Sequence, residues 1–107
     1  MQRAAGAQRV EIANGKGTSG LAQRVSKLIG AATPRLTNDK PYGAVTSRIQ
    51  YVDGAERMAR DINARLPQPL PLARMSGLDR DVQVRVLLGK DFSSGEHLAD
   101  LSTRRNS

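Results

Sequence analysis

Three glycines within six residues separate the first apolar segment of the chain from its first amphipathic segment. They lie in Asn14–Gly20 (NGKGTSG), between an alternating run that contains Val10 and Ile12 and a helical pattern that begins at Leu21. Glycine adopts positive φ at no steric cost, so the backbone can turn sharply here and the helix can start close to the strand. The chain is therefore predicted to open with a strand–turn–helix unit.

The same glycines match G-x-G-x-x-G, the pattern of dinucleotide-binding turns, and Asp39 lies near the position where that pattern is followed by an acid. A dinucleotide site needs two halves with parallel strands. The chain has two helical patterns, and a short turn between its second and third strands predicts an antiparallel hairpin. We therefore predict no nucleotide cofactor.

Two interpretations of the turn remain. Backbone N–H groups at the helix start, beside a lysine, could hold a small anion (Gly15, Lys16, Gly17, Thr18, Ser19 and Gly20). We favour the simpler reading, in which the glycines only shape the turn and the side-chain amide of Asn14 braces it. Thr18 or Ser19 is the expected N-cap of the helix.

Hydrophobic periodicity predicts six elements between residues 9 and 92. Alternation predicts strands, and an i, i+4, i+7, i+8 stripe predicts helices: strands at 9–13, 34–37, 45–52 and 81–88, helices at 21–29 and 55–66. The proline-rich segment 67–72 is predicted to be an extended connector. The order β-α-β-β-α-β predicts an α+β fold, a four-stranded, mainly antiparallel sheet with two helices packed on one face, as in the split βαβ arrangement.

The sheet face opposite the helices is expected to be open. By alternation it carries mainly polar side chains (Glu11, Arg48, Gln50, Gln83, Arg85 and Leu87). Two arginines and two glutamines on an open face form a candidate binding surface. Arg48, Gln50, Gln83 and Arg85 are therefore the candidate ligand-binding residues.

Composition excludes several classes of site. The chain has no cysteine, which excludes a disulfide scaffold, a thiolate metal site and a cysteine nucleophile. Its one histidine, His97, lies in a polar tail, so neither a metal site nor a histidine base for a serine nucleophile is predicted. We expect no cofactor and no enzymatic activity.

The charge balance favours anionic partners. The chain has 17 Lys and Arg against 10 Asp and Glu, a formal net charge of +7. Nucleic acid, anionic headgroups and anionic wall polymers all attract such a surface, and a basic surface without a ligand is an equal alternative. RNA-binding sheets present aromatic residues for base stacking. With two tyrosines and one phenylalanine in the chain, specific nucleic-acid binding is not predicted. No apolar run approaches the ~18 residues of a membrane span.

Three blocks of the sequence resemble the LytR C-terminal domain family. Val10–Ala22 resembles its V-x-V-x-N-G-x-G-x-x-G-L-A opening, 49–56 its middle segment, and Val84–Phe92 its V-x-V-x-L-G-x-D-[FY] ending. The structural motif residues in these blocks are Asn14, Gly15, Gly17, Gly20, Gly89 and Asp91. The long connector 67–80 and the lack of an aromatic-rich middle strand depart from the family pattern.

The resemblance implies a non-catalytic accessory module of the bacterial cell envelope, in the periplasm or elsewhere outside the cytoplasm. Together with the basic sheet face it favours binding of peptidoglycan or an anionic wall polymer. The alternative is a protein–protein interaction module of an envelope secretion or pilus assembly, attached to tetratricopeptide repeats or a membrane anchor, with Leu70, Leu72 or Leu87 as anchors. A spacer without a ligand is a third reading.

The expected organisation is a disordered lead-in at residues 1–8, one LytR-C-terminal-like domain at 9–92 and a polar tail at 93–107. We expect any export signal to lie upstream of this segment.

Overall fold

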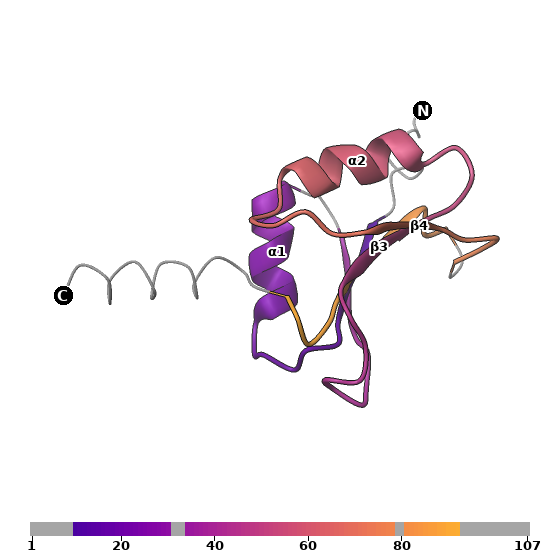
Figure 1. The fold of residues 1–107 in the computed structure, drawn as a ribbon. Coiled ribbons are helices and arrows are strands. Elements are labelled where there is room, and N and C mark those ends of the chain that lie inside the picture. The colour runs from indigo at the N-terminus through magenta and orange to yellow at the C-terminus, as the bar shows by residue number, and fades with distance from the viewer. Residues whose placement is uncertain (1–9, 31–33, 79–80, 93–107) are drawn as a thin grey trace.

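Two βαβ units and a final strand make up the part of the chain that the computed structural model describes, residues 10–30, 34–78 and 81–92 (Figure 1). The elements, in chain order, are β1 (Val10–Asn14), α1 (Leu21–Ile29), β2 (Arg35–Asn38), β3 (Arg48–Tyr51), α2 (Glu56–Ala64), β4 (Leu72–Arg74) and β5 (Val84–Leu88). The predictions for residues 1–8 and 93–107 lie outside the described residues.

The strands form one mixed sheet in the order β2-β1-β5-β3-β4. β1 is parallel to β2 and to β5, β3 is parallel to β4, and β3 is antiparallel to β5. Each βαβ unit thus returns to the sheet through a helical crossover. The two units run in opposite directions, and the C-terminal strand β5 lies between them.

The α+β class and the two helices are as predicted, but the predicted sheet is wrong in two respects. The described residues form five strands rather than four, and three of their four pairings are parallel. The expected hairpin between the second and third strands does not form, because β2 pairs with β1 at one edge while β3 lies beyond β5. The connection between β2 and β3 is short enough for a hairpin, but it crosses the ends of β1 and β5 before β3 begins.

The missed strand is β4, which lies in the segment predicted to be a proline-rich connector. Ile49 N donates to Pro71 O at 2.8 Å, and Met75 N donates to Tyr51 O at 2.7 Å, which joins this segment to β3. β4 is an edge strand, where the missing N–H of a nearby proline leaves no partner unpaired.

α1 and α2 pack against the same face of the sheet and share one hydrophobic core with it (Figure 1). Ile12, Val86 and Ile49 are register partners across β1, β5 and β3, and all three side chains are fully buried beneath the helices. α1 presents Leu21, Val25 and Ile29 to them, and α2 presents Ala59 and Ile62. The opposite face is called the helix-free face below.

Residues 39–47 connect β2 to β3 and cross the carboxyl ends of β1 and β5; we call this segment the strap, the loop leading into β3 at the lower edge of Figure 1. Asp39 N donates to Asn14 O at 2.9 Å and Gly43 N to Gly15 O at 2.7 Å, so the strap follows the end of β1. Lys90 N donates to Val45 O at 2.9 Å beyond β5. The strap therefore covers the carboxyl ends of these two strands.

Candidate functional site

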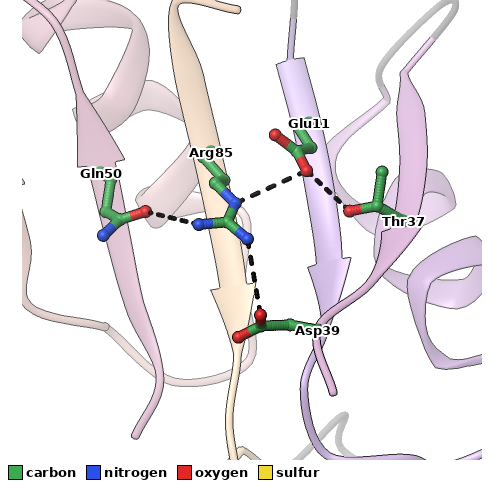
Figure 2. A network of polar contacts seen from close by, with 5 residues as sticks. All are labelled: Glu11, Thr37, Asp39, Gln50 and Arg85. Carbon is green, nitrogen blue, oxygen red and sulfur yellow. Dashed lines mark hydrogen bonds and ion pairs between the residues drawn. The ribbon is translucent and has the colours of Figure 1, made fainter. Parts of the chain in front are cut away.

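Five polar side chains form a network across the helix-free face (Figure 2). Arg85 of β5 is at its centre: Nη1 donates to Gln50 Oε1 at 3.3 Å, Nε lies 3.5 Å from Glu11 Oε2, and Nη2 lies 3.9 Å from Asp39 Oδ1. Thr37 Oγ1 donates to the same Glu11 oxygen at 2.7 Å. The network joins β3, β5, β1 and β2, together with the first residue of the strap.

Strand register produces this arrangement. Arg85 is the register partner of Glu11 on one side and of Gln50 on the other, so the three side chains leave the sheet on the same face. Glu11 and Gln50 are buried, at 4% and 8% exposure. A carboxylate removed from water needs a charged or hydrogen-bonding partner, and Arg85 and Thr37 supply both.

The four predicted ligand residues fall into two pairs. Gln50 and Arg85 are hydrogen-bonded to each other within the network. Arg48 and Gln83 lie half-buried on the same face. Within the described residues, neither of these two side chains has a hydrogen-bond or ion-pair partner.

Sequence reasoning missed Thr37 and Asp39 as members of the network. Their contribution depends on β2 lying beside β1, and the predicted hairpin put that strand elsewhere. The alternation of Arg35 and Thr37 shows that they share a face, but no residue in the sequence identifies the neighbouring strand.

The apolar anchors expected for protein binding are not exposed. Leu87 and Leu70 are buried, at 3% and 5% exposure, and the half-buried Leu72 packs against the core. Leu87 lies on the helix-free face between its register partners Ala13 and Arg48. Ala13 is fully buried as well, so these two adjacent apolar side chains of the face are not available as anchors.

Asn14 braces the glycine turn between β1 and α1. Its Oδ1 accepts hydrogen bonds from the N–H groups of Lys16 and Gly17, at 3.1 and 2.9 Å, and its Nδ2 donates to Thr18 O at 2.9 Å. Lys16 Nζ donates to Phe92 O. Several donors that could hold an anion in this turn are thus already used inside the protein.

Gly20 is the N-cap of α1, in a left-handed conformation with φ of 73°, and no side chain caps the helix. The prediction of Thr18 or Ser19 as N-cap is therefore wrong, because the turn reaches the helix through a conformation that favours glycine. Gly30, with φ of 68°, ends α1 as predicted.

The strap packs against the second glycine of the G-x-G-x-x-G turn. β1, α1 and β2 form a parallel crossover, so the topological argument against a nucleotide does not hold. In dinucleotide sites the second glycine of the pattern lets the pyrophosphate approach the backbone. Here a Cβ added to Gly17 would lie 2.8 Å from Cγ of Tyr42. A strap side chain thus occupies the space that the glycine leaves open.

Asp91 and Gly89 fasten the other end of the strap. Asp91 Oδ1 accepts a hydrogen bond from Ser47 N at 2.7 Å, and Gly89 N donates to Ser47 Oγ at 2.8 Å. Hydrogen bonds from the backbone and the hydroxyl of Ser47 hold the pKa of Asp91 below its ordinary value. A Cβ at Gly89 would lie 2.4 Å from Val45 O, so the close contact requires glycine.

Among the described residues, no group of three or more His, Asp or Glu side chains is arranged to hold a metal ion. Neither α1 nor α2 has the length and the run of apolar residues needed to cross a bilayer.

The sequence matches the LytR_C family, described as LytR cell envelope-related transcriptional attenuator, over residues 7–92. The chain belongs to this family. LytR_C is a regulatory or accessory family related to the cell envelope rather than a known catalytic one. The match includes the glycine turn, the strap and the helix-free face.

Among solved structures, the C-terminal domain of RV0431, determined in solution, is similar with a TM-score of 0.48 and 22% sequence identity. The alignment covers 77% of this chain and 71% of that one. No curated protein has a significant match to the chain.

Proposed function

We propose that this domain is a non-catalytic module of the cell envelope that binds peptidoglycan or an anionic wall polymer on its helix-free face. The observation that carries the proposal is the ordered polar network on a sheet face that neither α1 nor α2 covers. Family membership supports the location at the envelope, and we propose that the domain works outside the cytoplasm.

The network suits a carbohydrate or anionic ligand for a physical reason. Gln50, Arg85 and Glu11 are already held in place by one another. Binding therefore loses less side-chain entropy than it would at a mobile surface. Arg48 and Gln83 lie on the same face, and neither side chain has a hydrogen-bond or ion-pair partner among the residues that the structure describes.

The experiment is a pull-down of the purified domain with peptidoglycan sacculi. The test variant is Arg48→Gln/Gln83→Ala, which changes two side chains outside the network and leaves the Arg85 network intact. The matched control is Arg57→Gln/Gln23→Ala, the same chemistry at exposed positions on α2 and α1. We expect the test variant to be recovered much less than wild type and the control equally. Equal recovery of all three proteins would contradict binding at this face.

A protein–protein role is the second candidate, favoured by one observation. Leu36 is 42% exposed on β2, an edge strand of the described sheet, and an exposed strand edge can pair with a partner strand. Here we expect Leu36→Lys to abolish capture of an envelope protein that wild type retains, without changing recovery on sacculi. If Leu36→Lys captures the same partner as wild type, this candidate is excluded.

A further inference from the structure

Arg48 is the half-buried arginine of the helix-free face that has no carboxylate partner within the described part of the chain. Arg85, on the neighbouring strand, has two carboxylates within 4 Å, those of Glu11 and Asp39. Arg48 has no acidic partner among the described residues, and its Nε is buried without a hydrogen bond. Arg85 Nε also lacks a hydrogen bond, but the Glu11 carboxylate lies 3.5 Å from it. A buried polar nitrogen without a partner is unfavourable, and an anionic ligand oxygen beside Arg48 would offset that cost.

Gln50 offers a second donor beside Arg48. The two residues are two apart on β3, so they share a face and their Cα atoms are about 7 Å apart. Arg85 donates to Gln50 Oε1, which fixes the amide so that its nitrogen points away from Arg85 (Figure 2). Within the described chain that nitrogen donates no hydrogen bond. The Gln50 amide therefore presents its nitrogen as a donor, while its oxygen is turned towards Arg85.

We propose that Arg48 and the amide nitrogen of Gln50 bind an anionic oxygen group of the ligand, a phosphodiester or a carboxylate carried by a polymer. The inference rests on the proposed function and specifies its ligand as an anionic polymer rather than a neutral glycan. Arg85 is a positioning residue: it orients Gln50 and is itself neutralised. Charge-assisted hydrogen bonds from a guanidinium and an amide complement such oxygens.

Two variants test this subsite. Arg48→Gln removes the charge. Gln50→Glu is nearly isosteric and keeps an oxygen for Arg85, but replaces the outward donor with an anionic acceptor. Each should weaken binding of an anionic polymer by about tenfold or more, as expected for a hydrogen bond to a charged group. Arg57→Gln on α2 removes the same charge from an exposed position and is the matched control. Thermal unfolding of each variant shows whether it is folded.

The binding assay has soluble and insoluble arms. Inorganic polyphosphate, polygalacturonate and dextran serve as phosphate, carboxylate and neutral probes. Sacculi are used before and after hydrofluoric acid, which removes phosphodiester-linked polymers. We expect polyphosphate or polygalacturonate to bind, dextran not to bind, and affinity to fall with salt. Loss of binding to treated sacculi would identify the phosphate source, and retention would identify carboxylates.

The outcomes separate the inference from the proposed function. If wild type binds sacculi but Arg48→Gln and Gln50→Glu bind equally well, the subsite is wrong while the module still binds the wall. If wild type binds no sacculi but binds a soluble polyanion through Arg48, the wall-binding function fails and the subsite stands. A loss in Arg57→Gln as large as in Arg48→Gln would show general charge attraction and overturn the inference.

Discussion

Replacing Arg85 with methionine should destabilise the domain mainly through Glu11. The Glu11 side chain is 5% exposed, and Nε of Arg85 lies 3.5 Å from its carboxylate. Leaving one member of a buried ion pair unpartnered costs about 3–5 kcal/mol. We expect Arg85→Met to lower the free energy of unfolding by about 2–4 kcal/mol. The loss is smaller than the full cost because Thr37 still donates to the carboxylate and Arg85 is itself partly exposed. The melting temperature should fall on the order of 10–20 °C.

Urea denaturation followed by circular dichroism measures the free energy of unfolding. The double variant Arg85→Met/Glu11→Gln removes the orphaned charge and should recover at least half of the loss. Arg57→Met, on the exposed surface of α2, should change stability by less than about 0.5 kcal/mol. If Arg85→Met is as mild as that control, or if the double variant is no more stable than the single one, the buried carboxylate does not depend on Arg85.

Two further predictions concern the strap. Gly89→Ala should destabilise by about 3 kcal/mol, because its Cβ would lie 2.4 Å from the backbone oxygen of Val45; Gly77→Ala, with no atom within 4 Å, should be nearly neutral in the same urea experiment. For Asp91, a pKa below the ordinary 3.8 means that its stabilising effect is present above pH 3.8 and is lost as the pH falls towards the lower native value. Wild type should therefore exceed Asp91→Asn in stability at pH 7, and the gap should close in acid. A gap that stays constant with pH would show that the Asp91 charge does not hold the strap.

Local elements could be predicted from the sequence, but their arrangement could not. The stripe from Leu21 to Ile29 requires a helix with one buried face, and Gly30 ends it. Alternation assigned Arg85 and Leu87 of β5 to the open face, which leaves Val84, Val86 and Leu88 for the core, where all three are fully buried. Such patterns are local, because they depend only on the period of each element.

The direction of β2 depends on the strap, which the sequence does not reveal. Residues 39–47 contain turn-forming residues that suit a hairpin equally well. The alternative is a crossing held by distant contacts, such as Gly43 N to Gly15 O and Ser47 N to Asp91 Oδ1. The burial of Leu87 in the candidate site could not be predicted from its own segment either. Its alternation places it on the polar face, yet it is buried there, with Ala13 and Arg48 as its register partners on the neighbouring strands.

The last strand of the described chain lies in the middle of the sheet. Until β5 arrives, the two βαβ units have no strand pairing with each other, and β1 and β3 each leave a row of backbone groups unpaired. Contacts between residues so far apart in the chain slow folding, and open strand edges are sites of aggregation. A nascent chain that stops before Val84 should therefore consist of two separate, aggregation-prone βαβ units. The final strand, once synthesised, pairs with both of them and joins them into one domain.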